Sequence, residues 1–253
     1  MNIASRIILN NPNYISAKSY IQDGLIGHWD GIENNGYGIH GNWLSYWKDL
    51  TGSGADWNIS SFFKINDDNV ECTAYVNGAN AGTPGHLPAS FTYAYYSNIR
   101  TIETVIDGTG LSTYGSIQFF SFSSGNSTRK ITFRNADNLK RFLTAYGSDT
   151  SGTTSSYYIN IPNDSVRVLF SFSNDYLASK CLFCGKYYNK LNGAAYNYSY
   201  GNNPMIGGYG ASGQNPTNAK FKSIRIYNRS LTEEEQKYNY NIDYKRFNLN
   251  FTP

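Results

Sequence analysis

The sequence predicts an all-β protein: a two-sheet antiparallel sandwich with a short C-terminal helix and an N-terminal arm. Aromatic residues make up 16% of the chain and charged residues 15%, with 23 tyrosines and 24 glycines. Such a composition is typical of short strands joined by tight turns. Apolar or alternating runs recur roughly every 8 to 15 residues, and Gly, Asn, Asp or Ser separates nearly all of them. No helical pattern interrupts these runs before residue 231.

The stretch near the end of the chain has the clearest pattern. Residues 221–228 alternate with period two, and Ile224 and Ile226 share one face, which predicts a buried strand. Thr232, with Glu235 three residues later, matches a capping box. Residues 233–235 are all glutamates, which suit the positive end of a helix dipole. We therefore expect a strand, a turn and a helix over about 231–246.

Further strands and two chain segments follow from the same reasoning. We expect a hairpin at 137–146 and a polar loop at 147–156. Residues 1–22 are predicted to form an arm or linker that lies on a neighbour or on the domain edge. An ordinary first strand and loop is the alternative. Residues 23–253 form the main domain. The other expected strands are 25–30, 57–63, 70–76, 101–106, 116–122, 130–133, 157–161, 166–172 and 180–183.

Charge and apolar content exclude several classes of partner. The formal net charge of +3 is scattered, which argues against a nucleic-acid partner. No apolar run approaches the roughly 20 residues of a membrane span, and the first residues do not match a signal peptide. Cys181 and Cys184 have CxxC spacing, but a zinc site would need further Cys or His ligands that the pattern does not supply. We therefore expect Cys72, Cys181 and Cys184 to be reduced structural thiols.

Three segments together resemble the concanavalin A-like, or laminin G-like, jelly-roll superfamily. They are DGLIGHWDGIEN at 23–34, WKDLTGSG at 47–54 and IRIYNRSLTEEE at 224–235, and Ile206-Gly207-Gly208 matches the family's IGG strand. The opening segments resemble a subset found in gut-bacterial surface proteins and phage virion proteins. The resemblance implies two curved sheets, with any ligand on the concave face and its rim loops. Members include lectins, glycoside hydrolases, adhesion modules and capsid or tail decorations, so the fold does not choose among them.

Candidate catalytic residues are few. The hydrolases of this superfamily carry a carboxylate motif that the sequence lacks. Glu103 and Asp107 would share a strand face but lie about 13 Å apart, too far for a catalytic carboxylate pair. His28 is expected to be a packed or hydrogen-bonded strand residue. No G-x-S-x-G is present. We therefore expect no enzymatic activity and no catalytic residue.

Calcium is common in the superfamily. Many relatives carry an aspartate just before the strand that here begins near Ile224, and this chain has Ser223 in that place. The difference argues against a metal site of the family type. Calcium stays possible through other carboxylates, which also suit turns. The alternative ligands are Asp49, Asp56, Asp67 and Asp68.

Glycan contact is predicted at an aromatic segment. Tyr196, Tyr198 and Tyr200 would fall on one strand face, where their rings could stack on sugars, with Tyr209 following and Trp43 as a weaker candidate. A sandwich surface or a subunit contact explains the same tyrosines.

The sequence favours a non-enzymatic binding or structural module. We expect a virion decoration, fibre or attachment protein of a phage, located in the virion and able to bind glycans. It would form a homo-oligomer, possibly a trimer, with other virion or cell-surface proteins as partners. One alternative is a secreted bacterial carbohydrate-binding domain, extracellular or on the cell surface. The other is a glycoside hydrolase of the same fold.

Overall fold

The structure is a computed structural model of the whole chain. It describes residues 14–42, 45–59, 63–72, 100–107 and 220–249 in full. Elsewhere it describes the backbone of strands between residues 75 and 206, with side-chain burial at Leu182 and Ile206.

The first sheet contains eight of the described strands, all paired antiparallel. Its order is β16-β15-β14-β9-β18-β5-β4, and β1 pairs with β18 off this path. The strands are β1 (Leu25–Asp30), β4 (Phe63–Asn66), β5 (Asn69–Cys72), β9 (Thr101–Asp107), β14 (Arg167–Asp175), β15 (Ala178–Phe183), β16 (Lys186–Asn189) and β18 (Lys220–Tyr227).

The second sheet also has eight described strands, in the order β13-β12-β11-β10-β17-β8-β3-β2. A separate two-stranded ribbon joins β6 (Tyr75–Val76) to β7 (Ala79–Asn80). The strands of the second sheet are β2 (Tyr46–Trp47), β3 (Trp57–Asn58), β8 (Gly85–His86), β10 (Ile117–Ser121), β11 (Lys130–Ala136), β12 (Leu139–Tyr146), β13 (Ser155–Asn160) and β17 (Met205–Ile206).

The structure confirms the mostly-β class, the antiparallel pairing and the C-terminal helix. The hairpin predicted at 137–146 is confirmed only in part: residues 139–146 form one strand, β12, which makes a hairpin with the preceding strand β11 and pairs with it from Ala136↔Leu139 onward. The single strand predicted at 57–63 is wrong: β3 covers only Trp57–Asn58, and Phe63 starts β4 in the other sheet. The face-to-face jelly-roll arrangement of the two sheets stays a prediction, as does the domain boundary at residue 22.

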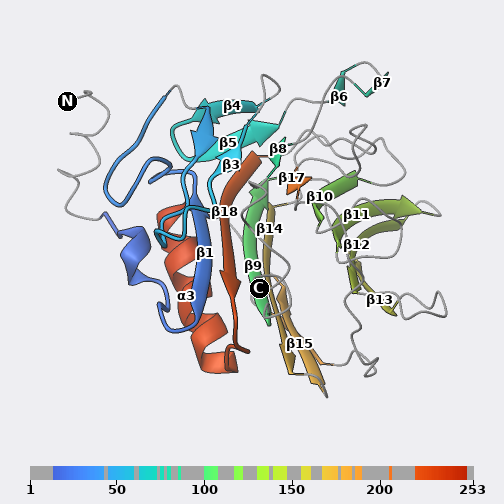
Figure 1. Cartoon of the computed structure of the whole chain (residues 1–253). Coiled ribbons are helices and arrows are strands. Elements are labelled where there is room, and N and C mark those ends of the chain that lie inside the picture. The colour runs from blue at the N-terminus through green and yellow to red at the C-terminus, as the bar shows by residue number, and fades with distance from the viewer. Residues whose placement is uncertain are drawn as a thin grey trace.

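Strand β18 lies between β1 and β9 and is buried almost throughout (Figure 1). Ile224 and Ile226 are 1% and 0% exposed, as their shared strand face predicts. Trp29 of β1 pairs in register with Ile224, and its indole Nε1 donates to the Ala55 carbonyl at 2.8 Å. Trp29 and Trp57 meet edge to face with ring centroids 5.4 Å apart. This apolar side of β18 and β1 forms part of the core.

Helix α3 (Glu233–Arg246) lies alongside β1 and β18 (Figure 1). It begins with the predicted capping box: the Thr232 hydroxyl accepts from Glu235 N, and the Glu235 carboxylate accepts from Thr232 N. Both reciprocal bonds satisfy backbone donors that would otherwise lack partners at a helix start.

The segment before β1 is fastened to this helix. It contains a short 3-10 helix, η1 (Ala17–Ser19), and Ala17 and Tyr20 are buried together with Leu50 and Ile242 of α3. The backbone N–H of Ile21 donates to the Asn239 side chain of α3 at 3.0 Å. Residues 14–22 are therefore part of the packed structure.

The capping box gives a first prediction. Replacing Thr232 with Ala removes the side-chain acceptor for Glu235 N and should lower the free energy of unfolding by about 1 kcal/mol. Urea denaturation measures the change. The Thr232→Ser variant keeps the hydroxyl and should match the wild type. An equal loss in both variants would contradict the role of the cap.

Candidate functional site

The five predicted glycan-contact residues lie outside the described residues, and their role stays a prediction. Each of them lies in the sequence between a described strand of the first sheet and one of the second. The Tyr196–Tyr200 segment lies between β16 and β17, and Tyr209 lies between β17 and β18. Trp43 lies between β1 and β2, which starts three residues after it. The chain order alone therefore does not assign these residues to one sheet.

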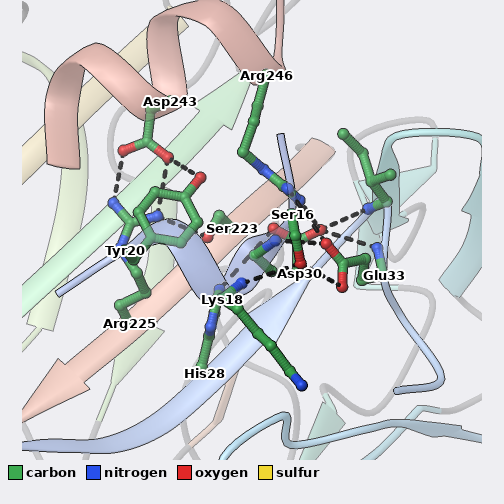
Figure 2. Close-up of polar contacts among 12 residues, drawn as sticks. Ser16, Lys18, Tyr20, His28, Asp30, Glu33, Ser223, Arg225, Asp243 and Arg246 are labelled. Carbon is green, nitrogen blue, oxygen red and sulfur yellow. Dashed lines mark hydrogen bonds and ion pairs between the residues drawn. The ribbon is translucent and has the colours of Figure 1, made fainter. Parts of the chain in front are cut away.

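Six of the described charged side chains meet in a buried network between α3 and the first sheet. At its centre is Arg225 of β18, whose guanidinium donates to Asp243 of α3 at 2.5 and 2.8 Å. Its Nε donates to Glu103 of β9 at 3.0 Å. Tyr20 covers the guanidinium with its ring, 3.9 Å from the ring centroid, and donates its hydroxyl to Asp243 at 2.7 Å. Figure 2 shows the contacts of Arg225 with Asp243 and with the Tyr20 ring.

A second arginine extends the network toward β1. Arg246, in the last turn of α3, donates to Asp30 at 2.7 Å and to Glu33 at 3.2 Å (Figure 2). It also donates to the Ile15 carbonyl. Glu33 in turn accepts from the backbone N–H of Ala17 and, at 2.6 Å, from that of Gly38. The network therefore ties residues 14–22, β1 and α3 together.

This network is closed to solvent. The side chains of Arg225, Arg246, Asp30, Glu33 and Asp243 are all between 0% and 2% exposed. Buried charges of this kind are stabilised by their partners, and no substrate can reach them without displacing α3. We therefore assign the network a structural role.

The residues that the sequence singled out for catalysis belong to this network or its border. Glu103 is 2% exposed and accepts from Arg225 and, at 2.7 Å, from Asn239. Asp107 is buried four residues farther along β9. The structure thus leaves these two as members of a buried strand face, as the spacing predicted.

His28 is a packed strand residue, as the sequence predicts. Its ring is 0% exposed and meets Tyr20 edge to face, with the ring centroids 5.3 Å apart. Burial lowers the pKa of His28 well below its usual value, and the positive charges of Arg225 and Arg246 lower it further. His28 is therefore neutral in the folded protein.

The aspartates considered for calcium are held by hydrogen-bond donors and a lysine. Asp49 accepts from His28 N, from the backbone N–H and hydroxyl of Thr51, and from those of Ser53. Asp56 accepts from Lys48 and from Asp49 N. Ser223 accepts from Arg225 at 3.0 Å. The five donors on Asp49 occupy the lone pairs that a cation would need, whereas Asp56 is paired with the lysine and accepts one described hydrogen bond on each oxygen.

Partial burial raises the pKa of Asp68, but the ion pair with Lys222 and a hydrogen bond from Asn69 outweigh burial, so the pKa is lowered. Asp67, the fourth calcium candidate, is not part of the buried network around Arg225 and Arg246. Among the fully described ranges, no three acidic, His or Cys side chains gather in a way that could hold a metal ion. Possible calcium binding elsewhere stays a prediction.

Local sequence patterns do not predict the network, although a signal for it exists. The polar residues Gln236, Asn239, Asp243 and Arg246 recur at spacings of 3, 4 and 3, the positions that an amphipathic helix usually gives to apolar residues. Gln236, Asn239 and Asp243 are indeed among the buried residues of α3. The signal in the sequence is a stripe of polar residues at the spacing of core positions. It lies in a helix that follows a strand with a central arginine.

Comparisons with known proteins show a likeness of fold. No family model matches the chain, and no curated protein matches it in sequence. Among solved structures, it resembles Trypanosoma rangeli sialidase, with a TM-score of 0.59 and 14% identity over 85% of this chain. The same values hold for that sialidase in complex with sialic acid. A mutant of it displaying trans-sialidase activity gives a TM-score of 0.58. The match covers 32% of the sialidase, so this chain corresponds to about a third of its length.

These structures support the coarser part of the resemblance seen in the sequence: a β fold that is compatible with the concanavalin A-like superfamily. At 14% identity the likeness concerns the fold alone. No helix among the described residues is long and apolar enough to cross a membrane.

The expectation that the chain is not an enzyme is contradicted. The structures that resemble it are sialidases, which are enzymes acting on glycans, and one is a mutant with trans-sialidase activity. The expectation relied on the missing carboxylate pair. That criterion fails for sialidases, because they use a tyrosine nucleophile and are an exception to the two-carboxylate mechanism. The missing pair therefore does not exclude glycan chemistry.

The network predicts a large effect of one substitution. Replacing Arg225 with Met leaves Glu103 and Asp243 buried without their cation, which should cost about 3 to 5 kcal/mol of unfolding free energy. Chemical denaturation measures it. Lys48→Met is the matched control, because Lys48 is 45% exposed in its ion pair with Asp56, and exposed pairs contribute about 0 to 1 kcal/mol. A loss at Arg225 no greater than at Lys48 would contradict the network's role.

The lowered pKa of His28 predicts loss of stability in acid. The unfolded chain takes up a proton on His28 below a pH of about 6.5, whereas the folded protein does not, so stability falls as the pH decreases through that range. The slope attributable to His28 approaches about 1.4 kcal/mol per pH unit. Unfolding free energies between pH 8 and 5 should show a shallower slope in His28→Gln. An unchanged slope would be evidence against a neutral buried His28.

Proposed function

We propose that this chain is a carbohydrate-binding domain that recognises glycans carrying sialic acid. The observation that supports it most is the likeness, over 85% of this chain, to a sialidase whose structure was solved with sialic acid. The likeness is one of fold, so the ligand class is the proposal's own step. A formal net charge of +3 is compatible with an acidic sugar.

The second sheet is the part of the chain proposed to hold the ligand. One side of the first sheet is occupied by α3 and residues 14–22. Asp243 and Arg246 of α3 bind Arg225 and Asp30, and Asn239 of α3 donates to Glu103. The tyrosine segment and Trp43 follow strands of the first sheet, β16 and β1, and precede strands of the second, β17 and β2. We assign them to the second sheet because the described side of the first is covered. Aromatic rings stack on the apolar faces of sugars, while nearby amides and hydroxyls bind sugar hydroxyls.

We propose that the chain binds the glycan, and a separate assay measures whether it also hydrolyses it. The chain spans about a third of the sialidase it resembles, so that enzyme's whole activity does not transfer with the fold. The virion location, the trimer and the virion partners are predictions from the sequence that no observation on the structure addresses. The comparisons favour the carbohydrate-binding alternative over them.

Glycan binding can be tested on paired ligands. The protein should bind sialylated glycans on an array and lose the signal after the array is treated to remove sialic acid. Tyr198→Ala should weaken binding by roughly 5- to 150-fold, if a stacked sugar contributes the roughly 1 to 3 kcal/mol of a base stacked on an aromatic ring. Tyr238→Ala is the matched control, because Tyr238 is 50% exposed on α3, away from the second sheet.

Two results would contradict the proposal. One is binding that does not change when sialic acid is removed, and the other is absence of binding to every sialylated glycan on the array. A parallel assay for release of sialic acid from the same glycans separates recognition from turnover. Release of the sugar would extend the function to catalysis.

A further inference from the structure

One buried carboxyl group in the network has all its described hydrogen bonds on a single oxygen. Asp30 Oδ1 accepts from Ile32 N and Glu33 N, both at 2.9 Å, and from Arg246 at 2.7 Å. Asp30 Oδ2 is buried and has no hydrogen-bond partner. An ionised carboxylate spreads its charge over both oxygens, so leaving one of them buried without a donor is costly. A carboxylic acid explains the asymmetry, because its hydroxyl oxygen needs an acceptor instead.

An acceptor lies next to that oxygen. His28 Nε2 is 3.9 Å from Asp30 Oδ2, and it too is buried without a hydrogen-bond partner. Both side chains are 0% exposed. With the ring proton of His28 on Nδ1, which like Nε2 has no hydrogen-bond partner, Asp30 Oδ2 and His28 Nε2 are two acceptors that repel, whereas one proton between them satisfies both. Side-chain rotations that shorten the separation by about 1 Å bring the two atoms within hydrogen-bond range.

The charges around the pair favour the extra proton. The network contains four carboxyl groups, on Asp30, Glu33, Glu103 and Asp243, but two guanidinium groups, on Arg225 and Arg246. With all four carboxyls ionised, the buried cluster would carry excess negative charge, which is expensive in a medium of low dielectric constant. Protonation of one carboxyl reduces the excess.

The other carboxyls are poorer places for that proton. Asp243 accepts on both oxygens, from Tyr20 and Arg225 on Oδ1 and from Arg225 on Oδ2. Glu33 also accepts on both oxygens, from Ala17 N and Arg246 on Oε1 and from Gly38 N on Oε2. Each oxygen of these two groups already has a donor. Glu103 accepts from Arg225 and Asn239 on Oε2, and its Oε1 is not among the buried oxygens that lack a partner. Among the described carboxyls of the cluster, Asp30 has the bare oxygen beside a bare nitrogen.

We infer that Asp30 is a buried carboxylic acid in the folded protein, and that its proton lies on Oδ2 and is donated to neutral His28 Nε2. The site thus binds a proton, and that proton completes the fastening of residues 14–22 and α3 to β1. The surrounding charged and titratable groups are Tyr14 and Tyr20 before β1, Glu33 after it, Arg225 of β18, Glu103 of β9, and Asp243 and Arg246 of α3.

The directions of both pKa shifts agree with this geometry. Burial raises the pKa of Asp30 despite the opposing effect of Arg246, and burial lowers the pKa of His28. A raised folded pKa gives a contribution to stability that is complete below the unfolded value, about 3.9, and is lost as the pH rises through the folded value. The Asp30 contribution therefore weakens toward alkaline pH, opposite in sense to that of His28.

Vibrational and NMR spectra of the full chain can detect the proton directly. In its folded state the protein should show the infrared carbonyl band of a protonated carboxyl group at pH values where exposed aspartates are ionised. Its His28 ring should give the ¹⁵N shifts of a neutral imidazole with Nε2 as acceptor. The band should disappear in Asp30→Asn and remain in Asp49→Asn.

The same two variants give a stability test. Asparagine in place of Asp30 keeps a carbonyl for Arg246 and puts an N–H group where the acid proton lies, so the thermal midpoint should stay near that of the wild type. Asp49 accepts hydrogen bonds on both oxygens, and the amide group of Asn would place a second donor against some of those donors. Asp49→Asn should therefore clearly lower the thermal midpoint. Raising the pH should increase deuterium exchange at the backbone N–H groups of Ala17 and Ile21 beyond the intrinsic rate, and Asp30→Asn should abolish that increase.

Three results would overturn the inference. The first is the absence of the acid band in the folded wild-type protein. The second is ¹⁵N shifts at His28 of an imidazolium or of a neutral ring protonated at Nε2, either of which would place the shared proton on the histidine. The third is a loss of stability in Asp30→Asn as large as in Asp49→Asn, which would show that Asp30 acts as an ionised partner of Arg246.

Discussion

The buried guanidinium of Arg225 is the constraint on which the arrangement of the described core depends. An arginine keeps its charge in any protein environment, so its burial in the middle of β18 requires anionic partners at fixed positions. Glu103 supplies one from β9 and Asp243 supplies the other from α3. Because Asp243 meets the guanidinium through two parallel bonds, it fixes both the rotation of α3 and its height along the sheet. Tyr20 then has one place to lie: over the guanidinium, with its hydroxyl on the same carboxylate.

A polar core of this kind gains specificity more clearly than stability. An apolar interface of the same volume would hold a helix on a sheet as well or better, but it would tolerate sliding by a turn. Here Asn239 bonds Glu103 and Tyr227, Asp243 bonds Arg225, and Arg246 bonds Asp30, so each turn of α3 has its own partner. Our hypothesis is that α3 cannot slide along the sheet, because sliding by a turn would leave several buried charges without partners at once.

Local patterns predicted the elements, but they did not predict this network. The alternation at 221–228 and the capping box at 232–235 specify β18 and the start of α3 because both depend on near neighbours in the chain. Ser223, Arg225 and Tyr227 resemble a solvent-exposed strand face, and their burial depends on α3 covering them. The partner of Arg225 on β9 is separated from it by 122 residues, beyond the reach of periodicity or spacing. Trp57–Phe63 was assigned to one strand because its composition cannot show where a chain passes from one sheet to another.

The same distinction explains why function was harder to predict than fold. A carboxylate pair is a local signal for one mechanism of glycoside hydrolysis, and its absence was taken to exclude enzymes, yet sialidases work through a tyrosine. Tyrosine is favoured both in strands and at interfaces, so the 23 tyrosines do not indicate a binding site unless their positions in the fold are known. The network shows that one side of the first sheet is covered by α3 and residues 14–22. We therefore propose to seek a ligand that needs exposed rings at the second sheet, whose strands β17 and β2 are the next described strands after the Tyr196–Tyr200 segment and Trp43.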